Sequence, residues 1–369
     1  MTNNLGYLGN VNLKKARVDI QWTPEMVQEF LRCSQDPKYF AEKYVKIVHV
    51  DHGLIPIKLY DYQKEIIDTL QNNRRVTVVT SRQAGKTTTA AAIILHYILF
   101  NEHKTVALLA NKGDAAREIL ERIKLAFESL PNWLQSGVVE WNKGSIELEN
   151  GCKVIAAATS SSAIRGKSIS LLYIDEAAFV EGWDEFFASV FPTISSGNTT
   201  KILFTSTPNG LNHFYKTCRG AKDGTNGYGY IEVPWQRVPG RDEAWRQETL
   251  SAMDFDLEKF AQEFECEFQG SSGTLISSAC LKNLTPRVPI AENDGLKQYE
   301  SPSRDNKYVI VVDVSRGKGL DYSAFQVVDI TKMPYNQVCT YRNNMITPLD
   351  YSGVIHNVSK MYNDAVILV

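Results

Sequence analysis

The feature that most constrains this chain is a β-branched run that leads through a short loop into an apolar helix. The run VTVVT spans Val76–Thr80, the loop reads TSRQAGKTT over Thr80–Thr88, and the Ala/Ile/Leu-rich helix ends near Phe100. A phosphate-binding loop requires this context, because the backbone N–H groups of the loop and the N-terminus of the helix then point at the phosphates. The segment therefore predicts a nucleotide-binding α/β domain.

Strands and helices alternate along the chain on both sides of this loop. Such alternation predicts an α/β fold with a mainly parallel sheet, and continuous apolar strands fit a sheet that is covered on both faces. Helices are expected at 22–30, 64–70, 114–130 and 242–268, and one is expected after Trp183. The strands expected with them are 105–110, 170–176, 201–207 and 230–235, with short ones around Val138, Ile146 and Val154.

Length and a change of composition predict more than one domain. At about 100–200 residues per domain, a chain of 369 residues makes two or three domains. The stretch 269–303 lacks periodicity, and strands at 308–314, 323–330 and 336–342 follow it, with a helix near 349–362. Residues 365–369 read as a bare final strand, so we expect the chain to be cut inside its last domain. The expected parts are an N-terminal accessory segment (1–55), a nucleotide-binding core (56–220), an accessory subdomain that completes it (221–270), a linker (271–303) and an incomplete second domain (304–369).

Composition excludes several classes of protein. The 40 Lys and Arg against 42 Asp and Glu leave a formal net charge of −2, which excludes a globally basic nucleic-acid coat but allows a local basic groove. The longest apolar stretch, Ala90–Phe100, is too short to cross a bilayer, and the polar start has no signal-peptide pattern. Six cysteines lie far apart without a C-x-x-C pair, so neither a disulfide framework nor a zinc site is supported. We expect a soluble intracellular protein that uses no membrane.

The loop supplies the candidate phosphate-binding residues. Lys86 would reach the β- and γ-phosphates of ATP, and the hydroxyl of Thr87 would bind Mg²⁺. The common pattern has Gly where this chain has Thr80, so the loop by itself is also compatible with an ordinary strand–turn–helix. The candidate residues are Ser81, Arg82, Gln83, Ala84, Gly85, Lys86, Thr87 and Thr88.

Two acids end the later apolar strand LLYIDE. Buried acids are costly without a partner, and a metal ion with its phosphate supplies one. We expect Asp175 to hold the Mg²⁺ shell and Glu176 to polarise the attacking water as general base, the alternative being a solvated pair that caps a helix. The next strand ends in Thr205, Ser206 and Thr207, whose hydroxyls either sense the γ-phosphate and pass its loss to a moving element or simply form a polar strand end.

Upstream residues and two arginines are further candidates. The amide of Gln63 can read the adenine edge and the ring of Tyr62 can stack on it, although a surface Gln and a core Tyr are the commoner arrangement. Arg82 in the loop, or Arg165 in SAIRGKS, could supply positive charge to a phosphoryl-transfer transition state. We favour Arg82 because of its position, and simple solvation is the alternative for both.

A second acidic pair lies near the C-terminus. Asp313 ends the strand YVIVVDV, a Gly-rich turn follows, and Asp321 opens the next strand. Two adjacent antiparallel strands would bring these carboxylates near one another, as two-metal phosphodiester cleavage requires. Aspartates beside a hairpin turn are common, so a purely structural role is the alternative.

Taken together, these motifs resemble the large terminase subunit of tailed bacteriophages, particularly the myovirus type. The matching segments follow in the same order from about residue 55 to 325: DYQKEI, TSRQAGKTT, SAIRGKSISLLYIDEAAF, FTSTPNG, FAQEFECEFQGSSGTLIS and VDVSRGKGLDYSAF. The resemblance implies a RecA/ASCE-type P-loop ATPase that drives double-stranded DNA into an empty procapsid, followed by an RNase H-like α/β nuclease that cuts the DNA concatemer. It also makes Thr80 a family feature.

The resemblance implies residue roles and partners as well. Tyr62 and Gln63 match the adenine motif of the family, and Asp313 matches the first nuclease metal ligand, with Asp321 as a nearby acid for Mg²⁺ or Mn²⁺. The catalytic positions it implies are Glu176, Arg82, Lys86 and Asp313. The implied partners are double-stranded DNA, the portal protein of the procapsid, the small terminase subunit and further copies of the chain in a ring on the portal. The implied location is the cytoplasm of the infected bacterial host.

The family nuclease normally has further acids that these 369 residues lack, so we expect ATP hydrolysis but little or no DNA cleavage. Two alternatives remain. A superfamily 2 helicase-like translocase usually carries a second RecA-like domain, and the downstream pattern shows no such parallel repeat. A non-hydrolysing ATP-binding scaffold would bridge DNA and a partner, and Glu176 argues against it.

Overall fold

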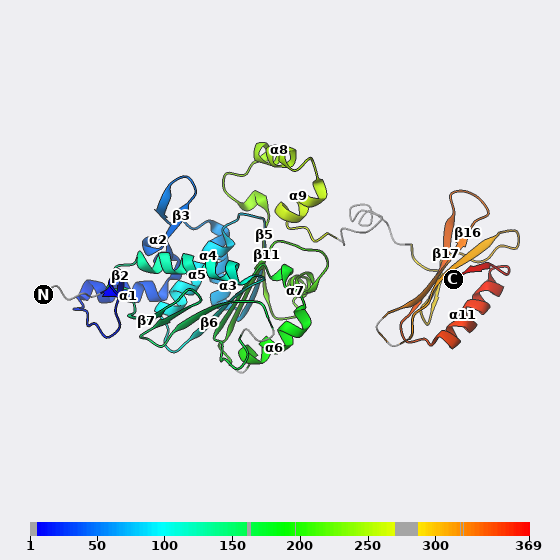
Figure 1. The fold of residues 1–369 in the computed structure, drawn as a ribbon. Helices are drawn as coiled ribbons and strands as arrows, with labels where there is room; N and C mark the ends of the chain where they lie inside the picture. Colours follow the sequence, from blue (N-terminus) through cyan, green and yellow to red (C-terminus); the bar gives the residue numbers. More distant parts are fainter. Residues whose placement is uncertain (1–5, 161–163, 196, 270–286, 318, 320) are drawn as a thin grey trace. The chain divides into compact units, whose positions relative to one another are not determined.

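An eight-stranded sheet forms the centre of the first of two units, Met1–Ser278 and Ala279–Val369 (Figure 1). The computed structural model describes residues 6–160, 164–195, 197–269, 287–317, 319 and 321–369. Strands β12 to β9 of the order β12-β5-β11-β10-β6-β9-β8-β7 are parallel, and β8 and β7 are antiparallel additions, which confirms the mainly parallel α/β prediction. The strands are β5 (Arg75–Thr80), β6 (Thr105–Ala110), β7 (Val138–Trp141), β8 (Ser145–Leu148), β9 (Lys153–Ala158), β10 (Leu171–Asp175), β11 (Lys201–Ser206) and β12 (Gly229–Val233).

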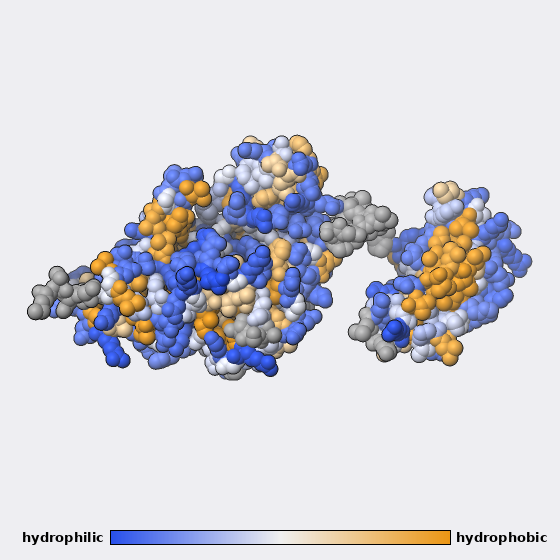
Figure 2. All heavy atoms as spheres, in the orientation of Figure 1, coloured by the Kyte–Doolittle hydropathy of each residue, from blue (hydrophilic) through white to orange (hydrophobic). Residues whose placement is uncertain are grey.

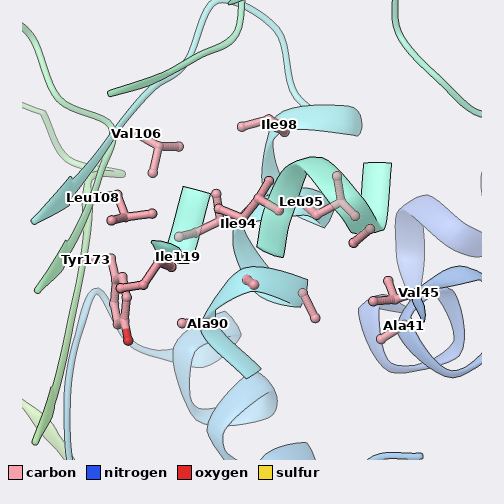
Figure 3. Packing of buried hydrophobic residues seen from close by; sticks show 14 of the residues in the cluster. Ala41, Val45, Ala90, Ile94, Leu95, Ile98, Val106, Leu108, Ile119 and Tyr173 are labelled. Atoms are coloured by element: carbon pink, nitrogen blue, oxygen red, sulfur yellow. The ribbon is translucent and has the colours of Figure 1, made fainter. Parts of the chain in front are cut away.

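Helices cover both faces of this sheet, because its strands carry apolar side chains on both sides. Val106 and Leu108 of β6 join Tyr173 in a core with α3, α4 and α5, where Figure 3 shows them facing Ile94 and Ile119. The alternate residues of the same strands pack on the opposite face against α6 and α7. The helices are α3 (Asp61–Asn72), α4 (Lys86–Leu99), α5 (Gly113–Glu128), α6 (Trp183–Ser195) and α7 (His213–Lys222).

The N-terminal residues pack on the layer of α3, α4 and α5. Thr23 caps the first helix, because its hydroxyl accepts a hydrogen bond from the N–H of Met26 and a proline follows it. Phe40 and Val45 are buried in the core shared with α4. Within the described ranges, none of the helices has the length and apolar character needed to cross a membrane. The elements here are β1 (Gly6–Tyr7), β2 (Asn10–Lys14), α1 (Pro24–Gln35), α2 (Pro37–Tyr44), β3 (Lys46–His49) and β4 (Gly53–Pro56).

The single helix predicted over 242–268 was wrong, because the chain turns in its middle. It forms α8 (Glu243–Ala252) and α9 (Leu257–Phe264), separated by Asp254 and Phe255, which have φ of 54° and 57°. The turn lets the two helices close on each other around a small core of Trp235, Leu250 and Phe260, which a straight helix would leave exposed. We refer to residues 235–264 as the clamp segment.

The second unit is a six-stranded sheet of order β13-β14-β17-β16-β15-β18 with α11 on one face. The prediction of a linker over 271–303 was wrong for part of that range, since β13 and β14 form a hairpin that pairs with β17. Their length of three residues each gives too little periodicity to detect; residues 270–286 lie outside the described ranges. Figure 2 shows hydrophobic residues gathered on one face of this unit. Val311 of β15 and the three residues of β18 are exposed. The elements are β13 (Ala291–Asn293), β14 (Leu296–Gln298), β15 (Tyr308–Asp313), β16 (Ser323–Asp329), β17 (Asn336–Asn343), α11 (Pro348–Met361) and β18 (Val366–Leu368).

Candidate nucleotide site

The loop after β5 and the acids after β10 meet at the carboxyl edge of the sheet. Lys86 Nζ donates to Glu176 Oε1 at 2.7 Å, and Thr87 Oγ1 donates to Asp175 Oδ2 at 3.3 Å. Open parallel sheets place their ligands at this edge, where the strands end and the helices begin. The structure thus brings together the four residues for which the sequence predicts a Mg²⁺–ATP site.

Strand β11 places the Thr-Ser-Thr motif between these two groups, because it lies between β5 and β10 in the sheet. Thr205 Oγ1 donates to Asp175 Oδ1 at 2.9 Å, and Ser206 Oγ donates to Glu176 Oε2 at 3.3 Å. Thr207 follows and is buried. Each acid is therefore held from one side by the loop helix and from the other side by β11.

The site places two carboxylates next to each other, of which Asp175 is buried and Glu176 is partly exposed. Burial is the main cause that raises the pKa of Asp175, while Lys86 lowers it and Glu176 raises it further. Tyr173 is fully buried, and its hydroxyl lies 3.0 Å from Thr205 Oγ1. Two carboxylates with one lysine leave uncompensated charge, and hydroxyl and carboxylate oxygens are ligands that Mg²⁺ prefers. Thr87 and Asp175 therefore fit a magnesium ion in chemistry and in position.

The conformation of the loop explains why glycine is needed at one position and not at another. Gly85 has φ +69°, and a Cβ there would lie 2.9 Å from Gln63 Nε2. Thr80 is the last residue of β5 and is not among the residues with positive φ, so a side chain is tolerated where the common pattern has glycine. Threonine in place of glycine at position 80 therefore causes no backbone strain in the loop.

Tyr62 and Gln63, the residues predicted to meet the adenine ring, pack against the phosphate loop. Tyr62 is 2% exposed, and its hydroxyl donates to the carbonyl of Ala84 at 2.9 Å. Gln63 is 4% exposed, accepts from the N–H of Tyr60 at 2.9 Å and donates to the carbonyl of Gly85 at 3.5 Å. Both side chains therefore support the loop, and their roles at the adenine ring stay predictions.

Arg82 and Arg165 are both exposed. Arg82 lies within the phosphate loop itself, between β5 and α4. The Nε of Arg82 lies 3.2 Å from Glu263 Oε2, and its backbone N–H donates to the Glu263 carbonyl at 2.8 Å. In this structure the guanidinium therefore faces the clamp segment. Its assignment as the arginine of the transition state stays a prediction.

Sequence reasoning missed the residues that hold the turn after Glu176. Glu176 has φ 52° and ψ 45°, a left-handed conformation that a side chain adopts at a cost. Asn212 Nδ2 donates to the Ala178 carbonyl at 2.7 Å, and His213 Nε2 lies 2.7 Å from the Ala177 carbonyl. The Asn-Gly-Leu-Asn-His run after the Thr-Ser-Thr motif was the only local signal for this support.

The second acidic pair lies at the end of β15 and just before β16. Strands β15 and β16 are antiparallel as predicted, with Asp313 opposite Ala324. Asp321 accepts the N–H of Tyr322 at 2.8 Å, and its carbonyl accepts from Ser315 Oγ at 2.9 Å. Across the described part of the chain, no three His, Cys, Asp or Glu side chains gather as a metal site would require. A metal shared by the two aspartates stays a prediction.

The loop that carries Lys86 and the acids that end β10 lie on either side of β11 in a mainly parallel sheet. This arrangement defines a RecA-like P-loop ATPase fold. The family model for the N-terminal part of the T4likevirus-type terminase large subunit matches residues 77–282, more than half of the chain. The chain therefore belongs to the terminase large subunit family.

Solved structures of phage terminases are among those that match this chain. The large terminase of bacteriophage HK97 matches with a TM-score of 0.56 and 16% identity, over 90% of this chain and 71% of that one. The ATPase domain of the Thermus phage P74-26 large terminase matches with a TM-score of 0.48 and 20% identity, over 57% and 94% of the two chains. The large terminase of another thermophilic bacteriophage matches with a TM-score of 0.48 and 12% identity, over 82% and 74%. Of these three, the HK97 match is the one that supports the fold.

Proposed function

We propose that this chain is an ATP-hydrolysing motor that moves double-stranded viral DNA into a procapsid. The observation that carries the proposal is the direct contact between Lys86 of the loop and Glu176 of the acidic strand. Membership of the terminase large subunit family supports the DNA substrate. The antiparallel strands β15, β16 and β17 distinguish the second unit from the second parallel RecA-like domain of a helicase.

The contacts in the site suggest how hydrolysis is triggered. Lys86 holds Glu176 Oε1 at 2.7 Å, so a γ-phosphate that draws the ammonium group toward itself frees that oxygen to accept a proton from water. Thr87 and Asp175 would hold Mg²⁺, which neutralises phosphate charge when bound. Loss of the γ-phosphate would return Lys86 to Glu176, and Ser206, which donates to Glu176, would pass the change to β11.

The proposal is tested by phosphate release from ATP by the purified protein. We expect turnover that requires Mg²⁺ and is abolished by a chelator, because the carboxylates and the triphosphate repel one another without the ion. Heat-denatured protein and AMP as substrate serve as controls. Phosphate release no faster than in these controls would contradict the ATPase proposal.

We propose in addition that the second unit belongs to an endonuclease that cuts concatemeric DNA with Mg²⁺ or Mn²⁺. Asp313 is exposed at the end of β15, where a phosphodiester can reach it, and the turn that follows leads to Asp321. We expect Asp313→Asn to remove at least about 90% of whatever Mn²⁺-dependent plasmid cleavage the protein shows, because a first metal ligand is lost. The exposed Asp305→Asn is the matched control. Detectable cleavage that is equal in wild type and Asp313→Asn would remove Asp313 from the site.

Family membership also supports the partners that we propose. These are the portal protein of the procapsid, the small terminase subunit and further copies of this chain in a ring on the portal, within the cytoplasm of the infected host. Arg82 is our candidate for the arginine that stabilises the transition state, either on ATP bound to its own copy or on the ATP of a neighbouring copy in the ring.

A further inference from the structure

The carbonyl groups of the phosphate loop are held from outside the loop. The Ala84 carbonyl accepts from the Tyr62 hydroxyl and the Gly85 carbonyl accepts from Gln63 Nε2. A loop can point successive N–H groups at a phosphate only when its carbonyls point elsewhere. The donors to these carbonyls therefore set how well the loop is preformed for nucleotide.

The first half of the loop is held by one side chain of the clamp segment, Arg241. One of its terminal nitrogens donates to the Arg82 carbonyl at 2.8 Å and to the Gln83 carbonyl at 3.3 Å. The other donates to Ser81 Oγ at 3.1 Å. The guanidinium carbon lies 4.6 Å from the centre of the Trp245 ring, which supports it from the clamp side. Arg241 thus contacts three consecutive loop residues and is itself half-buried.

The surroundings of Arg241 favour this bridging geometry. The guanidinium group has donors in a fixed planar fork, which suits several acceptors at once and which a lysine cannot reproduce. Glu263 of α9 reinforces the contact, because its carbonyl accepts the N–H of Arg82 at 2.8 Å. The clamp segment therefore contacts the loop at two places, through Arg241 and through Glu263.

We propose that Arg241 is the positioning residue of the phosphate-binding loop, so that nucleotide affinity depends on the docking of the clamp segment on residues 81–83. The inference rests on the proposed ATPase function. When the clamp segment is docked, the fork of Arg241 turns the carbonyls of Arg82 and Gln83 away from the phosphate side. Any movement of the clamp segment relative to the loop then changes the affinity for nucleotide.

The test compares Arg241→Ala with Arg237→Ala. Arg237 lies on the same segment and contacts Glu65 and the Glu232 carbonyl, but not the loop. We expect Arg241→Ala to weaken binding of a fluorescent Mg²⁺-ADP analogue at least about tenfold, since charged hydrogen bonds to the loop are lost. Arg241→Lys should recover part of this loss, and Arg237→Ala should leave the affinity unchanged.

A second readout does not need nucleotide. Hydrogen exchange of the peptide that covers residues 81–88 in nucleotide-free protein should be faster in Arg241→Ala and Arg241→Lys, and normal in Arg237→Ala. Folded Arg241→Ala, judged by circular dichroism, with wild-type affinity and exchange would overturn the proposal. Arg241→Lys decides the question by the same two measurements if the alanine variant does not fold. Wild-type protein that binds no nucleotide would instead refute the ATPase function, and the exchange rates alone would then decide the role of Arg241.

Discussion

Replacing Glu176 by Gln should lower ATP turnover by about 10²–10⁴-fold while ATP binding stays within a few-fold of wild type. The amide has the shape of the carboxylate and can still accept from Ser206, which donates to Glu176 at 3.3 Å. It cannot take a proton from the attacking water, so only the chemical step is lost. Steady-state phosphate release and equilibrium binding of a fluorescent ATP analogue measure the two effects separately.

The exposed Glu185→Gln, on α6 and away from the loop, is the matched control for this substitution. Its turnover should equal that of the wild type. Undiminished turnover in Glu176→Gln would refute the assigned general base. Loss of binding together with turnover would show that Glu176 holds the loop through Lys86 rather than activating water.

Replacing Lys86 by Ala should weaken binding of a non-hydrolysable Mg²⁺-ATP analogue by about 100-fold or more and make turnover undetectable, because a charge-assisted contact to the phosphates is lost. The loss has a second cause. Lys86 is the cation that lowers the pKa of Asp175, so its removal leaves two carboxylates that repel the triphosphate. Isothermal titration calorimetry measures the affinity directly.

The exposed Lys58→Ala is the control for Lys86→Ala, and it should bind normally. Stability provides an independent check on the same variant. Burial raises the pKa of Asp175 above its unfolded value, so the folded state binds the proton more tightly and the free energy of unfolding increases as pH falls through that pKa. This increase should be larger in Lys86→Ala than in wild type. If Lys86→Ala bound the ATP analogue as tightly as Lys58→Ala, Lys86 would not belong to the phosphate site.

The sequence was sufficient to predict those parts of the site whose position depends only on residues close to one another in the chain. Lys86 follows a β-branched strand and opens an apolar helix, and Asp175 and Glu176 end an apolar run. Strand ends and helix starts depend on local patterns, so the positions of these residues along the chain could be predicted before any fold was known. The motif order then indicated the terminase family, which the family match confirms.

The errors came from contacts between residues that are far apart in sequence. Residues 291–298 carry no strand pattern of their own and become strands only because β17 offers an edge to pair with. The turn at Asp254 and Phe255 exists because α8 and α9 bury a shared core.

The sequence by itself determined the strand–loop–helix, the acids after β10 and the hydroxyls after β11, because each depends on residues within a few positions of one another. Only the tertiary structure decided that β11 lies between β5 and β10, so that Thr205 and Ser206 reach both acids. It alone brought Arg241 to the loop, since that side chain is about 160 positions from the residues it holds. The physical reason is that strand order and clamp docking are set by burial and hydrogen bonding over the whole unit, and no local pattern records them.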